Sequence, residues 1–260
     1  MVTLERNMRQ QFVHDFRIRK RSGEMGLLFE TRASDSPWVE SVWICRSEQV
    51  SEMTSVATET WGLVFWELEG RRYTAITGPE SRTATAPVPE GAQFVGIQFA
   101  VGTSLRTTAT PALVDGGIAL PDVTGRTFWL DGAHRETPRA DDAEALVDRL
   151  VREEVVIRDP LVAATLAGSP PAVTERTLER RFRAATGLTQ GAVRQIGRAR
   201  TAALLLASGE MPGDVVAKLG YYDEPHLARA LRRYVGRTAQ ELRTRTGGAL
   251  ALDPGQCATS

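Results

Sequence analysis

The sequence predicts an α+β protein of two domains: a β-rich N-terminal domain, in the form of a barrel or sandwich, and an all-helical C-terminal domain. Three observations point to this class. Short β-type runs separated by glycine and proline turns fill residues 1–137. Helix-type periodicity fills residues 159–246, and one arginine-bearing segment occurs there twice. A chain of 260 residues is long enough to give each domain its own core.

The β-type runs of the N-terminal domain predict a small barrel or sandwich. Segments 61–68 (WGLVFWEL) and 71–77 (RRYTAIT) flank Glu69 and Gly70, a pattern that predicts a hairpin. Many short strands with intervening turns are typical of barrels and sandwiches. Further candidate strands cover 26–32, 41–46 and 92–101.

A helix is predicted over 138–156, between the two domains. Its apolar residues fall on one side, and Asp141 and Asp142 near its start suit the positive end of a helix dipole. The apolar side has two interpretations, a dimer interface or a face that packs on the protein's own sheet. Asp159 followed by Pro160 predicts the start of the next helix.

One segment of the C-terminal domain nearly repeats itself. Residues 178–194 and 227–243 lie 49 positions apart and share six of seventeen residues in register. Each copy has the apolar spacing of a short amphipathic helix, with arginines on a neighbouring stripe. Cap residues mark the starts and stops of the two helices: Thr174 and Asp223, then Gly187 and Gly236.

The segment before the second copy completes a helix-turn-helix. Residues 212–219 predict a short helix and 220–222 a turn, after which the arginine-bearing helix follows. Between the copies, 190–207 is a helix-compatible run that spans about 27 Å at 1.5 Å per residue. Successive major-groove faces of B-DNA are about 34 Å apart, so two such helices on this spacer can enter adjacent grooves.

The stretch 159–245 resembles the DNA-binding domain of the AraC/XylS family of bacterial transcription regulators. Three segments carry the resemblance: TERTLERRFRAATGLT (174–189), RQIGRARTAALLLASG (194–209) and VVAKLGYYDEPHLARALRRYVGRTAQELR (215–243). Family members have a full positioning helix before the first recognition helix, whereas here only SPPAV (169–173) separates DPLVAATLAG (159–168) from Thr174. Either the helix at 160–167 takes that role through a Pro-Pro turn, or the first helix-turn-helix is degenerate.

The resemblance implies a sequence-specific transcription regulator whose N-terminal domain is a cupin-like barrel that binds a small effector. It implies double-stranded DNA and a small-molecule effector as partners, with RNA polymerase for an activator and a second copy for a homodimer. No cofactor is expected. The domains then run 1–137 (effector sensing), 138–158 (connecting or dimerisation helix), 159–246 (two helix-turn-helix units) and 247–260 (flexible tail).

The resemblance also assigns DNA contacts to both recognition helices. Arginine can bridge guanine O6 and N7, and glutamate can accept from the cytosine amine. The base-facing residues are Arg176, Glu179, Arg180, Glu224, His226 and Arg229. The phosphate-facing residues are Arg183, Arg232 and Arg233, together with the helix starts at Thr189 and Thr238. Thr177 is the remaining residue of the expected DNA-binding set. Thr238 with Glu241 also fits a capping box.

The charge distribution favours a nucleic-acid partner for the C-terminal domain. Residues 170–246 hold 14 Lys and Arg against 7 Asp and Glu, and because the whole chain is neutral the remainder carries the opposite excess. Such asymmetry is expected when one part of a chain meets phosphate. Exposed arginines on a single helix usually form a solvated face, but two copies in register favour DNA binding.

Aromatic residues are the candidate lining of an effector pocket. The alternative is that they fill the core, as buried aromatics usually do. Trp61 and Trp66 are an odd number of residues apart, so in a regular strand they point to opposite faces. The candidate lining is Trp43, Trp61, Trp66, Glu67 and Tyr73.

Neither a metal site nor an enzyme motif is predicted. His14, His134 and His226 are too scattered to form one metal site. No nucleophile motif, phosphate loop or dinucleotide fingerprint occurs, so we expect no enzyme. Two alternatives stay open: a small-molecule-binding or catalytic barrel whose C-terminal helices serve assembly, and a DNA-binding protein without an effector.

Cysteine usage and hydropathy point to the cytoplasm. Cys45 and Cys257 do not suggest a disulfide framework. No apolar run approaches the roughly 20 residues that cross a bilayer. The N-terminus is too charged for a signal peptide.

Overall fold

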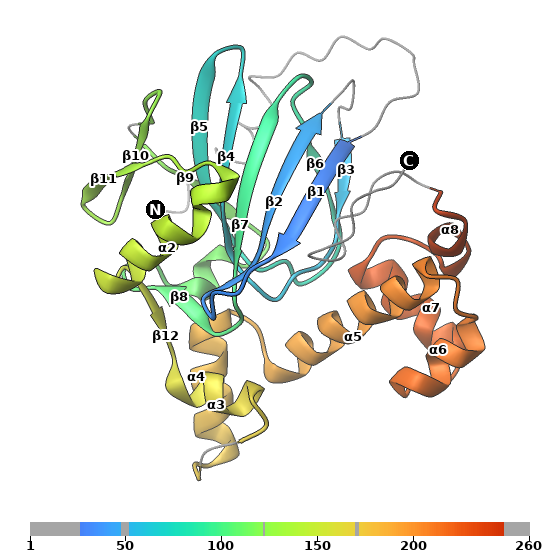
Figure 1. Ribbon diagram of the computed structural model, residues 1–260. Helices are drawn as coiled ribbons and strands as arrows, with labels where there is room; N and C mark the ends of the chain where they lie inside the picture. The colour runs from blue at the N-terminus through green and yellow to red at the C-terminus, as the bar shows by residue number, and fades with distance from the viewer. Residues whose placement is uncertain (1–26, 48–51, 122, 170–171, 247–260) are drawn as a thin grey trace.

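The computed structural model describes residues 27–47, 52–121, 123–169 and 172–246. Strands dominate the N-terminal region and helices the C-terminal region, which confirms the predicted fold class (Figure 1). The predicted tail 247–260 with Cys257, and also His14, Pro170 and Pro171, lie outside the described residues.

A six-stranded antiparallel sheet forms the frame of the N-terminal domain. Its strand order is β1-β2-β7-β4-β5-β9. The strands are β1 (Leu27–Ala33), β2 (Val39–Ser47), β7 (Gln93–Phe99), β4 (Gly62–Leu68), β5 (Arg71–Thr77) and β9 (Gly117–Ala119). The five strands that the sequence predicted are confirmed, with ends that shift by at most two residues.

The hairpin between β4 and β5 turns at the predicted dipeptide. Glu69 has φ 49° and Gly70 has φ 75°. Two central residues with positive φ make the turn whose twist matches the flanking strands. The turn fixes the register of the pair, with Leu68 opposite Arg71.

Among the described residues of this domain, three two-stranded sheets accompany the large one. They are β3 (Glu52–Ser55) with β6 (Ala84–Pro87), β10 (Thr127–Leu130) with β11 (Ala133–Glu136), and β8 (Thr103–Leu105) with β12 (Val156–Arg158). Two short 3-10 helices, η1 (Thr110–Leu113) and η2 (Ala140–Asp142), lie between strands and before α2.

The prediction of one helix over 138–156 is wrong at both ends, and its C-terminal end becomes a strand. Helix α2 spans Ala143–Arg152, and Glu154 then takes a left-handed backbone with φ 54°. This reversal turns the chain so that β12 pairs with β8. The pairing satisfies backbone groups that a continued helix would have satisfied internally.

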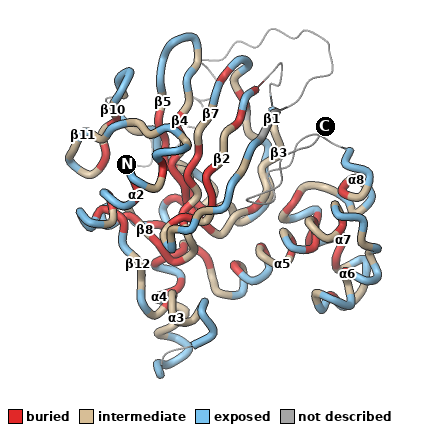
Figure 2. Tube along the Cα trace, viewed as in Figure 1, coloured by how far each residue is buried: buried red, intermediate tan, exposed pale blue. Residues whose placement is uncertain are grey.

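The apolar face of α2 packs on the sheet of its own domain. Its buried residues are Ala143, Leu146, Val147 and Leu150, and they share one core with Leu63, Phe65, Ile97 and Val156. Figure 2 shows buried residues concentrated where α2 meets the strands. The face that was open to two interpretations is therefore a core face, and the core of this domain extends beyond residue 137 to Val156.

The two faces of the large sheet carry different aromatic residues. Trp61 stacks on Phe99 with ring centroids 3.9 Å apart, and its indole N–H donates to the Thr103 carbonyl at 3.1 Å. On the other face, Trp66 stacks on Tyr73 at 5.2 Å. Trp61 is a core residue at 2% exposure, which corrects its assignment to an effector lining.

In the described part of the C-terminal region, residues 160–169 and 172–246, the structure has six helices. They are α3 (Pro160–Leu166), α4 (Glu175–Thr186), α5 (Gln190–Ala207), α6 (Pro212–Leu219), α7 (Glu224–Tyr234) and α8 (Ala239–Thr244). Helix α5 bridges α4 at one end and the group α6 to α8 at the other (Figure 1). Within the described residues, no helix has the length and apolar character needed to span a bilayer.

The two domains join through main-chain hydrogen bonds near the end of α7. The N–H of Ala57 donates to the Tyr234 carbonyl at 2.7 Å, and the N–H of Thr83 donates to the Arg233 carbonyl at 2.9 Å. Arg237 donates to the Thr54 hydroxyl at 3.3 Å. The segment around Ala57 is thus docked on the C-terminal helices.

Leu146→Ala is expected to destabilise the chain by about 2–5 kcal/mol, the cost of an alanine cavity in a packed core. Arg149→Ala, an exposed change on the same helix, is the matched control and should cost far less. Urea unfolding at several protein concentrations measures both. A loss that varies with concentration would mean that this face packs between copies rather than within one chain.

The free energy of unfolding is expected to depend on pH through Glu80, which pairs with Thr58 beside the contact between the domains. Burial raises the pKa of its carboxyl group from 4.5 to about 7, against a hydrogen bond from Ser55 that lowers it. The folded chain therefore keeps a proton that the unfolded chain has lost, so the free energy of unfolding should fall as pH rises from about 4.5 to 7.

Glu80→Gln should flatten this fall, because the amide carries no titrating proton. Unfolding at pH 5.5 and pH 8 measures the slope. Burial also raises the pKa of Glu59, so part of the slope remains. The pKa of Glu144 is held near 2 by its hydrogen bond from Arg32, so this group changes stability mainly below pH 4.5, outside the two measured values. A wild-type slope in the variant would contradict the assignment to Glu80.

Candidate nucleic-acid interface

Helices α6 and α7 form the predicted second helix-turn-helix. Gly220 ends α6 with φ 69°, a left-handed conformation that glycine adopts without strain. Asp223 then caps α7, since its carboxylate accepts from the N–H of His226 at 2.7 Å. Leu227 and Leu231 of α7 are buried against Val215 of α6. The predicted turn, cap and buried stripe are present.

The turn before α7 is held by a stack of three side chains. Arg198 of α5 lies 4.3 Å from the ring centre of Tyr221, and the ring of His226 meets Tyr221 edge-on at 5.2 Å. The Nδ1 atom of His226 accepts from the N–H of Tyr222 at 3.3 Å. His226, expected to face a base, therefore supports the turn with one side of its ring.

The outer face of α7 is basic and accessible. Arg229, Arg232 and Arg233 are exposed, and Glu224 is exposed at the first turn. Arg233 lies over the ring of Tyr234 at 5.3 Å. The arginines lie on a stripe separate from the buried leucines, as the amphipathic spacing predicted.

Helix α4 presents the same arrangement in the first unit. The Thr174 hydroxyl caps it by accepting from the N–H of Thr177 at 3.3 Å, and Gly187 ends it with φ 75°. Phe182 is fully buried. The remaining predicted residues lie outward, with Arg176, Arg180 and Arg183 exposed and Thr177 and Glu179 partly exposed.

Helix α3 packs against α4, as expected if the helix at 160–167 takes the positioning role in the first unit. Val162 packs in one cluster with Phe182. Asp159 caps α3 through the N–H of Leu161 at 2.9 Å and also pairs with Arg181 of α4, with Nε 2.6 Å from the carboxylate. The single residue Asp159 thus fixes the start of α3 against α4.

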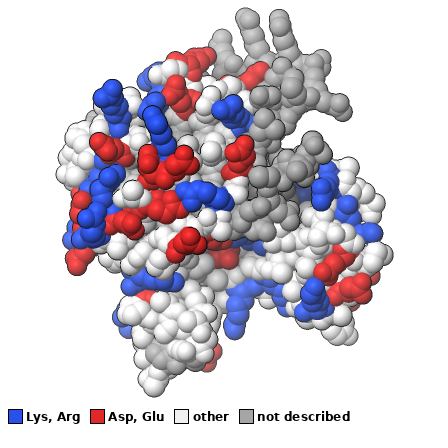
Figure 3. Space-filling model, in the orientation of Figure 1, with Lys and Arg blue, Asp and Glu red and all other residues white. Residues whose placement is uncertain are grey.

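The spacer α5 covers the predicted residues 190–207. Thr189 caps it, accepting from the N–H of Ala192 at 3.0 Å. Thr238 caps α8 in a capping box with Glu241, and these hydrogen bonds from Thr238 lower the pKa of the Glu241 carboxyl group. Basic side chains project below α5 between the two units in the view of Figure 3.

Sequence reasoning missed three arginines that hold this arrangement. Arg181, Arg198 and Arg200 each have a partner on another element. In the sequence, nothing in the residue type distinguishes these three arginines from the exposed ones. For Arg181 and Arg198, an aspartate at a helix start and a tyrosine in a turn were the available signals, whereas the partners of Arg200 lie more than 140 positions away.

A known protein family matches the sequence of this region. Residues 172–245 match a family described as a helix-turn-helix domain, and the match includes α4 through α8. A solved structure of ToxT from Vibrio cholerae is similar at 8% identity, over 85% of this chain and 100% of that chain, with a TM-score of 0.37. Among curated proteins, none matches the chain.

Proposed function

We propose that this chain is a DNA-binding transcription regulator of the AraC type. Residues 172–245, which match a helix-turn-helix domain, would read a two-part operator with α4 and α7. The observation that carries this proposal is that both arginine faces are exposed while both helices rest on one spacer. At about 1.5 Å per residue, the length of α5 is close to the distance between successive major-groove faces on one side of B-DNA, so α4 and α7 can enter adjacent major grooves.

The exposed side chains divide into base readers and phosphate contacts. Arginine forks toward guanine and glutamates toward cytosine are the expected base contacts. We assign these to Arg176, Glu179, Arg180, Glu224 and Arg229, with Thr177 beside them. We assign the phosphate contacts to Arg183, Arg232 and Arg233, and to the N–H groups at the helix starts after Thr189 and Thr238. His226 contributes through the turn that it supports.

The N-terminal domain is proposed to hold a small effector against the second face of its large sheet. Trp43, Trp66, Tyr73 and Phe94 are half-buried there, and Trp66 stacks on both Tyr73 and Phe94. Partly covered rings of this kind suit a small apolar or aromatic molecule. Glu67, ion-paired with Arg72, follows Trp66 on β4 and so points to the opposite face, which removes it from the proposed lining.

RNA polymerase and a second copy of the chain complete the proposed partners. An activator would contact the polymerase from a promoter site. A homodimer would need a surface other than the apolar face of α2, because Leu146 and its neighbours are buried within one chain.

Selection of genomic fragments with the full chain tests the proposal. We expect fragments that share two half-sites about 10–10.5 base pairs apart, one helical turn of DNA. Recovery of single half-sites would contradict the two-reader arrangement. No enrichment at all would favour the alternative in which the helices serve assembly.

Arg229→Ala should weaken binding to the selected operator by about 1–3 kcal/mol and relax the preference at one base pair. The reason is the loss of a forked contact to a guanine edge. Titration against the operator and its single-base variants measures both effects. Unchanged affinity would exclude Arg229 as a base reader.

Arg232→Ala, its matched partner on the same helix, should act differently. Loss of one phosphate contact should weaken binding to all sequences alike and reduce the slope of log affinity against log salt by about 1. Affinities between 50 and 200 mM salt give the slope. A change in sequence preference would move Arg232 to the base readers.

A further inference from the structure

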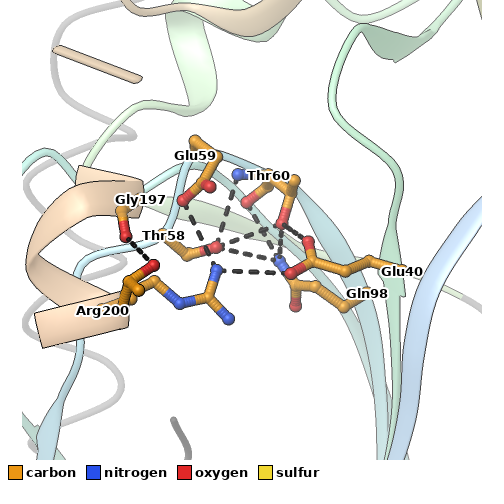
Figure 4. Close-up of polar contacts among 8 residues, drawn as sticks. Glu40, Thr58, Glu59, Thr60, Gln98, Gly197 and Arg200 are labelled. Atoms are coloured by element: carbon orange, nitrogen blue, oxygen red, sulfur yellow. Dashed lines mark hydrogen bonds and ion pairs between the residues drawn. The ribbon is translucent and has the colours of Figure 1, made fainter. Parts of the chain in front are cut away.

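Arg200 of α5 enters the N-terminal domain between two carboxylates. One guanidinium nitrogen, Nη1, lies 3.3 Å from Glu40 and 3.4 Å from Glu59 (Figure 4). The side chains of Arg200 and Glu59 are only 17% and 13% exposed. This is an ion cluster between domains, formed by residues more than 140 positions apart in sequence.

The carboxylates are tied to the large sheet by a polar network. The Thr60 hydroxyl donates to Glu40 at 3.4 Å, and Gln98 of β7 donates to the Thr60 hydroxyl at 2.5 Å and to its carbonyl at 3.1 Å. Thr58 also lies within hydrogen-bond distance of Thr60, at 3.1 Å. Arg200 therefore contacts a framework that extends into the sheet rather than two isolated side chains.

The segment next to these carboxylates touches both helix-turn-helix units. Val56 packs against the cluster of the second unit, and Ala57 is fully buried in the cluster of the first. The hydrogen bond from Ala57 to the Tyr234 carbonyl joins the same segment to the end of α7. Residues 56–60 thus form a brace, and Arg200 fixes α5 to it.

The charges make this contact depend on all three ionised groups. Burial raises the pKa of Glu59, opposed by Arg200 and assisted by Glu40. Burial alone would lower the pKa of Arg200, but the charges and hydrogen bonds of Glu40 and Glu59 outweigh this effect. The net pKa of Arg200 is raised, so the guanidinium stays charged. Removing one partner of a buried ion group leaves the others uncompensated, which costs far more than loss of an exposed pair.

We propose that Arg200 is a positioning residue for DNA binding: it anchors α5 to the N-terminal domain and so fixes the placement of the two recognition helices. The inference rests on the proposed function. With both readers held in one geometry, the second half-site binds without further ordering of the protein. Without the anchor, each reader still binds its half-site, but the pair no longer acts as one unit.

The test compares Arg200→Gln with Arg194→Gln in the full chain. Arg194 is exposed on the same helix, so its loss removes an equal charge without touching the brace. Relative to this control, Arg200→Gln should bind the selected two-half-site operator at least about fivefold more weakly, the lower end of measured couplings between sites. It should bind a duplex with one half-site equally well. Equal or tighter operator binding would overturn the proposal.

A second variant covers the case in which Arg200→Gln does not fold. Glu40→Gln with Glu59→Gln keeps Arg200 and neutralises its partners, and the same pattern of DNA binding is expected. Deuterium exchange at Ala57, whose N–H joins the domains, should quicken in both variants and not in Arg194→Gln. Unchanged exchange would overturn the anchor. A wild-type chain that binds no operator would instead overturn the proposed function.

Discussion

The apolar face of α5 is the constraint on which the DNA-binding region depends, because both helix-turn-helix units are built on it. Val193 and Ile196 belong to the first cluster, with Phe182 of α4. Alanines line the second half, and Ala199 and Ala203 let α7 approach closely. Protein interiors are packed as densely as organic crystals, so the side chains on this face set the distance between the readers. The core thus sets the spacing of α4 and α7, and residues 56–60, which pack against both units, add a second restraint from the N-terminal domain.

Much of this arrangement could be predicted because its causes are local. A hydroxyl or carboxylate before a helix, as at Thr174 and Asp223, satisfies N–H groups that have no other partner. A glycine that follows a helix in the left-handed conformation, as Gly187 does, ends that helix without help from distant residues. Exposure of Arg229 follows from burial of Leu227 and Leu231 on the opposite side of the same helix.

The predictions that failed concern contacts between distant residues. Apolar residues at Val155 and Val156 continue the pattern of α2, so the sequence favours a longer helix. Only the pairing of β12 with β8, fifty residues away, makes a strand better there. The docking of the domains is less visible still, since the N–H of Ala57 and the carbonyl of Tyr234 are groups that almost every residue has.

Arg198 and Arg200 show how one helix serves two partners. They are two residues apart, which on an α-helix places them about 200° apart around the axis. Arg198 stacks on Tyr221 and holds the turn before α7, whereas Arg200 meets the carboxylates of the N-terminal domain. Because both arginines belong to one continuous helix, α5 joins the contact with the N-terminal domain to the turn before α7. A buried ion group adds little stability but is sensitive to the loss of any one partner. The ion cluster therefore makes the link between the domains depend on each of its three charged residues more strongly than an apolar contact would.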